Sequence, residues 1–161
     1  MTNAYRAFIA LPLPRKVLDY LTGVQECLAA QGIRGRWVRP EAMHLTVKFL
    51  GHMESEKTET VRAALDQVAA NYPPLQLTTL GLGGFPNIGR PRVLWAGIGG
   101  DRTRLMGLQQ DIASLLEPLG WPKEKRPYKG HLTLARAKGR RPFEKQIGRL
   151  IAPCEPEEPL A

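Results

Sequence analysis

The sequence predicts an α+β protein with two pseudo-symmetric lobes, in which antiparallel or mixed sheets face a central cleft and helices lie outside. Short apolar strand-like runs alternate with amphipathic helical patterns along the chain. The order of these elements recurs in two halves, roughly residues 5–72 and 73–152. Each half also carries an Arg-Pro dipeptide followed by His-Leu-Thr, within residues 39–46 and 126–133.

The first half begins with an apolar strand-like run from Tyr5 to Leu13, followed by a helical pattern from Arg15 to Ala30. One face of this helix is apolar, through Val17, Leu18, Leu21, Val24 and Leu28. The strand with the first motif follows. A second amphipathic helix is predicted from about Ser55 to Ala70, with Ser55 as its N-cap.

The second half repeats this order with a strand from Arg92 to Ile98 and a helix from Asp101 to about Glu117. Asp101 is the expected N-cap, and Pro118 with Gly120 the expected stop. A further strand is expected over residues 75–80, a Gly/Pro-rich connection over 81–91 and a last helix over 143–151. Together these elements predict a single bilobal domain over residues 1–152. A disordered acidic, proline-rich tail is expected over 153–161.

The amino-acid composition is that of an ordinary globular protein. The 161 residues are 43% hydrophobic and 24% charged, as in ordinary globular proteins. No apolar run approaches the roughly 20 residues that a membrane-spanning helix needs. The two cysteines, Cys27 and Cys154, are far apart in the sequence, so we expect reduced cysteines in a cytoplasmic protein. We also expect a monomer.

The formal net charge of +8 is unevenly distributed. Lys and Arg residues crowd residues 121–149, around the second motif, where Glu124 and Glu144 are the acidic residues. A basic cluster at a candidate site favours a polyanionic partner such as RNA. The alternative is a solvated basic face that serves solubility.

The two motifs carry the candidate chemistry. Because alternate residues of a strand share a face, His44, Thr46 and Lys48 should point one way. His131 and Thr133 should likewise share a face. The opposite face of the first motif strand should enter the core, through Met43, Leu45, Val47 and Phe49. Two imidazoles and two hydroxyls would then converge on one site.

Such a site suits phosphodiester chemistry without a cofactor. A neutral histidine can take a proton from the nucleophile while a protonated one gives a proton to the leaving oxygen. Threonine hydroxyls and nearby cations can hold the phosphoryl oxygens. No closely spaced set of His, Cys and carboxylate residues predicts a metal site. No glycine pattern of a nucleophile elbow predicts a serine hydrolase.

These residues resemble the two-histidine phosphoesterase superfamily, and within it the RNA 2′,3′-cyclic phosphodiesterases, also described as 2′-5′ RNA ligases. The likeness runs from about Arg6 to Lys138 and includes residues 36–51, 83–86, 90–95 and 126–136. It implies metal-independent hydrolysis of an RNA terminal 2′,3′-cyclic phosphate to a 2′-phosphate. His44 and His131 would be catalytic, and Thr46, Thr133 and Arg136 would bind phosphate. The partner would be RNA or a nucleotide with a 2′,3′-cyclic phosphate end.

Four of the remaining assignments conflict with strand alternation or stay open. Arg136 falls on the face opposite His131 unless a bulge or strand end follows Ala135. Phe49 is a base-stacking candidate by resemblance, but alternation sends it to the core. Lys48 would either bind phosphate or extend to solvent at the strand end. Tyr128, in the basic loop, is the best exposed aromatic candidate for stacking on a base.

Alternative functions remain open at this point. The same site would suit a binding module for nucleotides or RNA ends without turnover. It would also suit a related phosphodiesterase acting on 2′-5′ oligonucleotides or ADP-ribose cyclic phosphate. Ligation would use a 5′-hydroxyl in place of water. The resemblance assigns water activation to His131 and leaving-group protonation to His44, an orientation that the sequence alone does not fix.

Overall fold

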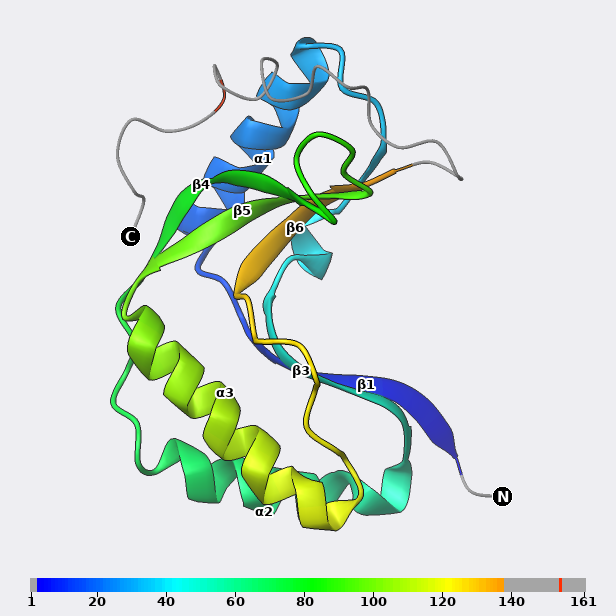
Figure 1. Ribbon diagram of the computed structural model, residues 1–161, viewed down its shortest axis with the longest axis vertical. Coiled ribbons are helices and arrows are strands. Elements are labelled where there is room, and N and C mark those ends of the chain that lie inside the picture. The colour runs from blue at the N-terminus through cyan, green and yellow to red at the C-terminus, as the bar shows by residue number, and fades with distance from the viewer. Residues whose placement is uncertain (1–2, 138–153, 155–161) are drawn as a thin grey trace. The chain divides into compact units, whose positions relative to one another are not determined.

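The computed structural model describes residues 3–137 and Cys154, and these residues form an α+β fold (Figure 1). Three α-helices are described within these ranges: α1 (Arg15–Ala30), α2 (Thr58–Ala69) and α3 (Arg102–Leu116). The strands within the same ranges are β1 (Ala4–Leu11), β2 (Arg36–Trp37), β3 (Leu45–Glu54), β4 (Leu77–Phe85), β5 (Val93–Gly100) and β6 (His131–Arg136). Short 3₁₀ turns cover Pro40–Ala42, Ser55–Lys57 and Glu117–Leu119.

The chain divides into two compact units. Unit 1 contains residues 1–11, 46–77 and 100–130, and unit 2 contains residues 12–45, 78–99 and 131–161. Each unit therefore draws on both halves of the sequence. The boundary crosses the first motif between Leu45 and Thr46 and immediately precedes the second motif at His131.

Unit 1 is built around a two-stranded sheet of β1 and β3 among the described residues, with α2 and α3 packed against each other (Figure 1). The apolar spacing of the two helices is that of amphipathic helices, and their buried faces meet. The core combines strand, helix and loop side chains: Val47, Leu50, Met53, Val61, Ala64, Val68, Leu108, Ile112, Leu116 and Trp121.

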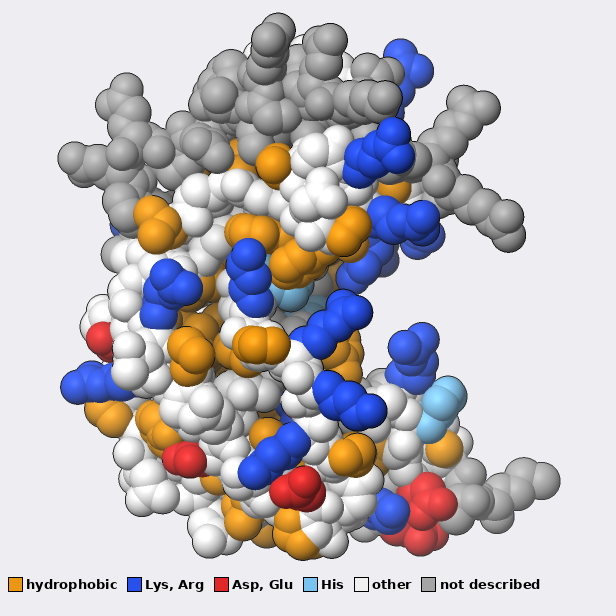
Figure 2. Space-filling view, in the orientation of Figure 1, with side chains coloured by type: hydrophobic (Ala, Val, Ile, Leu, Met, Phe, Trp, Pro, Cys, Tyr) orange, Lys and Arg blue, Asp and Glu red, His pale blue; other side chains and the backbone are white. Residues whose placement is uncertain are grey.

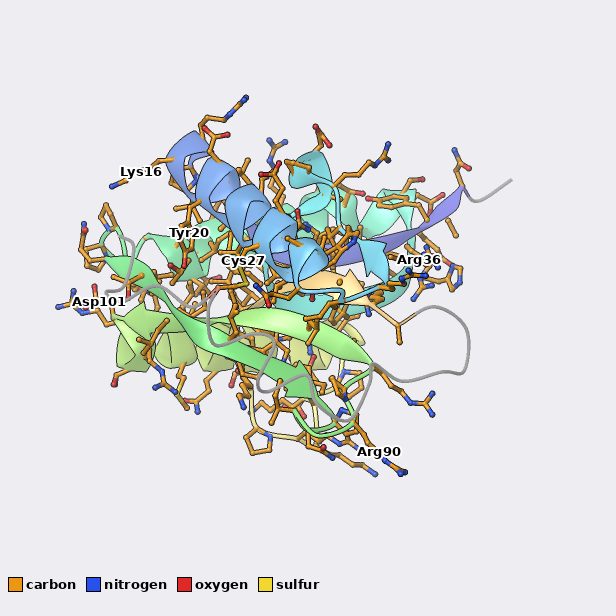
Figure 3. All side chains as sticks on the ribbon, turned by 90° about the horizontal axis from the view of Figure 1, so that it is seen from above. Lys16, Tyr20, Cys27, Arg36, Arg90 and Asp101 are labelled. Carbon is orange, nitrogen blue, oxygen red and sulfur yellow. A yellow bond between two sulfur atoms is a disulfide. The ribbon has the colours of Figure 1, made fainter. Side chains whose placement is uncertain are left out.

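Unit 2 is built around a sheet of strand order β2-β6-β5-β4 among the described residues, with β6 antiparallel to both β2 and β5. Helix α1 covers one face of this sheet (Figures 1 and 3). Val17, Leu21, Val24 and Leu28 are buried on α1, and Leu132 and Leu134 are buried on β6. The predicted antiparallel α+β class is confirmed. The single bilobal domain and its cleft stay predictions.

The predictions of α1, α2 and α3 are confirmed in position. Asp101 is the N-cap residue of α3, as predicted, whereas the N-cap residue of α2 is Lys57 and not Ser55. α1 spans the predicted residues, and α3 ends at a turn in which Gly120 has a φ of 107°. Neither Ser55 nor Asp101 caps a helix with its side chain. Ser55 instead starts a 3₁₀ turn, and the Asp101 carboxylate accepts a hydrogen bond from the Gln76 backbone N–H at 3.0 Å. The Asp101 carboxylate therefore bonds the residue that precedes β4 and not the first turn of α3.

The expectation of reduced cysteines is wrong. Cys27, on α1, forms a disulfide with Cys154, and the two Cα atoms are 5.7 Å apart (Figure 3). A spacing of 127 residues in the sequence gave no sign of this proximity. The helix predicted over 143–151 lies outside the described residues, as does the tail predicted over 153–161 except for Cys154. Among the helices described, none is long and apolar enough to span a bilayer.

Candidate active site

The second motif lies on β6, inside the sheet of unit 2. His131 pairs with Gly97 of β5, and Thr133 pairs with Trp95. His131 and Thr133 are half-buried, whereas Leu132 and Leu134 are fully buried. The predicted alternation therefore holds at the motif itself, with the imidazole and the hydroxyl on the face of the sheet opposite the apolar residues.

Two aromatic rings flank His131. The Phe85 ring meets the imidazole edge-on, with centroids 4.8 Å apart, and the Trp95 ring lies 6.3 Å away. A Cβ at Gly83 would overlap the Trp95 ring, so this glycine leaves the space that the indole occupies. Aromatic packing of this kind fixes the plane of the imidazole. The sequence prediction missed Phe85, because residues 81–91 read as a Gly/Pro-rich connection while β4 extends to Phe85.

A bulge in β6 brings Arg136 to the face of His131. Leu94 pairs with Ala135, but the next residue of β5, Trp95, pairs with Thr133, so Leu134 is the extra residue. In a bulge two successive residues oppose one, and alternation is reset. Leu134 and Ala135 are accordingly both buried, and Arg136 is exposed. The conflict between alternation and the predicted role of Arg136 is resolved in this way.

A buried glutamine of α1 holds the bulge. The Gln25 Nε2 amide donates hydrogen bonds to the backbone oxygens of Leu134 and Val38, each at 2.8 Å. The Leu134 oxygen also accepts from the Val38 N–H at 2.9 Å. Gln25 is 8% exposed. The glutamine therefore ties the end of β2 to the extra residue of β6.

The first motif spans the boundary of the two units. His44 follows the 3₁₀ turn Pro40–Ala42, which the Met43 N–H closes on the Pro40 oxygen, and immediately precedes β3. His44 belongs to unit 2, with His131, Thr133 and Arg136, whereas Thr46 belongs to unit 1. Both His44 and Thr46 are half-buried. Within the described ranges, no three His, Cys, Asp or Glu side chains are grouped as metal donors.

Lys48 on β3 is buried and bonded to the loop that follows α3. Its side chain is 1% exposed, and the ammonium donates to the Glu124 carboxylate at 2.9 Å and to the Pro122 oxygen at 3.0 Å. The alternative of a solvent-exposed lysine is therefore wrong. A buried ammonium needs a charged or polar partner, and the loop after α3 supplies both. These bonds favour a structural role for Lys48, which links β3 to that loop, over the predicted contact with phosphate.

Tyr128 is not the exposed aromatic residue that the sequence suggested. Its ring is half-buried, and its hydroxyl donates a hydrogen bond to the Thr46 backbone oxygen at 2.8 Å. Burial raises the pKa of Tyr128 to about 12, which keeps this donor protonated at neutral pH. Trp121 Nε1 similarly donates to the Leu50 oxygen at 3.1 Å. The loop of residues 121–128 is thus fastened along β3 at Leu50, Lys48 and Thr46.

Phe49 lies on the outer side of β3, so the prediction of a core position is wrong. It is 67% exposed, and its ring is 6.3 Å from that of Phe8 on β1, which is 47% exposed. Val47 and Lys48 are successive buried residues, so the alternation of burial shifts by one position there and leaves Phe49 outside. The sequence analysis did not identify Phe8 as a candidate, because its ring partner, Phe49, lies on a strand that is distant in the sequence. The other residues predicted to enter the core, Met43, Leu45 and Val47, are buried.

Comparisons with known proteins identify the family of this chain. Residues 11–95 match the family model for LigT-like phosphoesterases. An RNA 2′,3′-cyclic phosphodiesterase of Methanothermobacter thermautotrophicus is 31% identical over 140 residues, which cover 87% of this chain and 75% of that protein.

Solved structures show the same fold. TT0787 of Thermus thermophilus matches with a TM-score of 0.69 at 31% identity, over 84% of this chain and 75% of that one. E. coli LigT in complex with 3′-AMP matches with a TM-score of 0.63 at 26% identity, over 88% of this chain and 80% of that one. Two His-x-Thr motifs, the α+β fold and these matches together show that the chain belongs to the LigT-like phosphoesterase family.

Proposed function

We propose that this phosphoesterase hydrolyses the terminal 2′,3′-cyclic phosphate of RNA to a 2′-phosphate, with His44 and His131 as its acid–base pair. The observation that carries the proposal is the doubled motif. Each copy pairs a half-buried imidazole with a half-buried threonine two residues later. In unit 2, the bulge adds the Arg136 guanidinium to the face of His131 and Thr133. The name of the M. thermautotrophicus relative supports the same substrate.

The reaction needs two proton transfers. A water oxygen forms a bond to phosphorus as the bond between phosphorus and the 3′ oxygen breaks. One neutral histidine takes the proton of water, and one protonated histidine gives a proton to the 3′ oxygen. We assign the first role to His131 and the second to His44. The products are a 2′-phosphate and a free 3′-hydroxyl, and proton exchange with solvent restores both histidines.

The remaining groups stabilise charge on phosphorus. Thr46 and Thr133 would donate hydroxyl hydrogen bonds to the non-bridging oxygens, and Arg136 would balance their developing negative charge. The exposed pair Phe8 and Phe49 offers ring faces on which a base can stack. If a 5′-hydroxyl of another RNA replaces water, the same transfers form a 2′-5′ linkage.

The test is incubation of the purified protein with an oligoribonucleotide ending in a 2′,3′-cyclic phosphate, in EDTA, with the position of the product phosphate resolved. We expect a 2′-phosphate and a bell-shaped dependence of rate on pH, because one histidine must be neutral and the other protonated. His44→Ala and His131→Ala should each lower kcat by about 10²–10⁴-fold, the usual effect of losing a general acid or base.

His52→Ala is the matched control, since His52 is exposed on β3 and lies outside both motifs. It should keep full activity and the same fold by circular dichroism. Full activity in either motif variant, or a strict need for a divalent ion, would contradict the acid–base assignment. Binding of the oligonucleotide without turnover would favour a binding module.

A further inference from the structure

A polar pocket of about 480 Å³ lies in unit 1, between α3 and the loop that leads to the second motif. The helix lines it with Gln109, Gln110, Ala113 and Ser114, and the loop with residues 123–128. Its volume lies within the range of about 300–1,000 Å³ that is typical of small-molecule sites. None of the residues assigned to the chemistry above lines it, and Tyr128 contributes one wall.

The pocket is positively charged. Lys123, Lys125 and Arg126 line it together with Glu124. Glu124 is already bonded to Lys48, and Lys123 lies 3.7 Å from Glu117. Across the part of the chain that the structure describes, Lys125 and Arg126 form no ion pair. Figure 2 shows Lys and Arg side chains gathered over this loop. Two cations are therefore available to an anionic ligand.

A buried amide opens into the same pocket. Gln109 is 7% exposed, which is unusual for a glutamine, and it lines the pocket. Among the described residues, its amide has no hydrogen-bond partner. The polar atoms of this amide are not fully enclosed by protein, so they reach solvent and are open to a ligand in the pocket. A ligand with both donors and acceptors would satisfy it, whereas a bare anion would meet its N–H groups alone.

We propose that this pocket binds a nucleotide of the RNA strand, separate from the nucleotide that carries the cyclic phosphate. Lys125 and Arg126 would meet its phosphodiester, and the Gln109 amide would meet the edge of its base. Unpaired bases show such edges, and proteins read them with amides and aromatic rings. The volume fits a nucleotide better than a phosphate ion.

The loop connects the pocket to the two motifs. It is fastened to β3 through Lys48 and through the bond from Tyr128 to the Thr46 oxygen. Only two residues separate Tyr128 from His131 in the sequence. Occupancy of the pocket would therefore act on a segment that is continuous with the second motif. The consequence is a preference for oligonucleotides over mononucleotides. This inference rests on the proposed function for its substrate.

The test compares two substrates, a cytidine 2′,3′-cyclic phosphate mononucleotide and a hexaribonucleotide with the same end. Gln109→Met and Arg126→Gln should each raise the KM of the hexanucleotide about 3- to 10-fold, the usual effect of one lost hydrogen bond or charged contact. The KM of the mononucleotide should not change. Ser114→Trp fills the pocket from an exposed position and should give the same pattern.

Arg102→Gln is the matched control, because Arg102 is exposed on α3 and does not line the pocket. Equal effects on both substrates, or no effect on either, would overturn the proposal.

Direct binding separates this proposal from the proposed function. Fluorescence anisotropy with a labelled hexaribonucleotide ending in a 3′-hydroxyl needs no turnover. Wild-type affinity should fall with salt, and Arg126→Gln should reduce the slope of log K against log salt by about 0.7. If neither substrate is turned over but the variants still weaken this binding, the proposed function fails and the pocket stands. Displacement of the hexanucleotide by millimolar inorganic phosphate alone would identify a simple anion site and overturn it.

Discussion

At the scale of single residues, neutral hydrogen-bond donors hold the segments that carry the motifs. Tyr128 is the clearest case, because its hydroxyl fixes the loop before His131 to the backbone of Thr46. Burial raises the pKa of this hydroxyl to about 12. The donor is therefore insensitive to pH throughout the range in which histidine chemistry operates.

The same shift predicts a loss of stability at high pH. An unfolded tyrosine ionises near pH 10, whereas folded Tyr128 keeps its proton until about pH 12. The stabilising contribution is present in full below pH 10 and is lost as pH rises toward 12. Since the ring is only half-buried, we expect about 1–2 kcal/mol. The free energy of unfolding of the wild type, measured in urea, should approach that of Tyr128→Phe over this range.

Tyr5→Phe is a suitable control, because it removes the hydroxyl of an exposed tyrosine that bonds Thr58. A constant difference in unfolding free energy between the wild type and Tyr128→Phe, from pH 9 to 12, would contradict the prediction. Other groups titrate in this range, and the comparison between variants cancels them.

At the scale of single elements, the bulge of β6 decides which side chains share a face. Gln25 satisfies the backbone oxygens of Leu134 and Val38 that the bulge leaves inside unit 2. Replacing it with an apolar side chain of similar shape removes both donors. We expect Gln25→Met to lower the free energy of unfolding by about 1–3 kcal/mol. Urea denaturation monitored by circular dichroism measures this, with Glu26→Met, an exposed neighbour, as control.

The same variant tests a positioning role. If Gln25 acts on the reaction through Arg136, then Gln25→Met should lower kcat/KM toward the value of Arg136→Ala. The double variant should then be no worse than Arg136→Ala alone, since coupled residues are not additive. Multiplied effects in the double variant would show that Gln25 and Arg136 act independently.

The bulge also shows what the sequence could and could not predict. Apolar periodicity located α1, α2 and α3 and the strands, because burial of one face leaves a regular pattern. The catalytic candidates came from a repeated phrase. The outward position of Phe49, the burial of Lys48 and the aromatic neighbours of His131 depend on pairing between distant segments. Such contacts leave no periodic pattern in the local sequence. The family resemblance suggested a role for Arg136 that conflicted with strand alternation, but it did not predict the bulge that places Arg136 on the face of His131.

At the scale of the whole molecule, the chain passes repeatedly between its two compact units. The disulfide between Cys27 and Cys154 adds a covalent link within unit 2 over a long stretch of sequence. A link that closes a loop of this length restricts the unfolded chain strongly. The chain-entropy model gives about 4–5 kcal/mol for loops of 100 residues or more.

We therefore expect Cys27→Ser to lower the unfolding free energy by about 2–5 kcal/mol in non-reducing buffer. Reduction with dithiothreitol should bring the wild type to the same value and leave the variant unchanged. Urea denaturation with a parallel count of free thiols measures both effects. The double variant Cys27→Ser with Cys154→Ser controls for a lone thiol. Two titratable thiols in the native, unreduced protein would contradict the link.

The extra residue in β6 has a consequence for anyone transplanting this chemistry. In a regular strand, side chains five positions apart face opposite ways, so His131 and Arg136 copied into an unbroken hairpin would be separated. The unit to transplant is thus the six-residue strand β6 with its bulge, together with a helix that donates an amide hydrogen bond to the bulge. A design that copied only the His-x-Thr motif would contain the imidazole of His131 but would not place the guanidinium of Arg136 beside it.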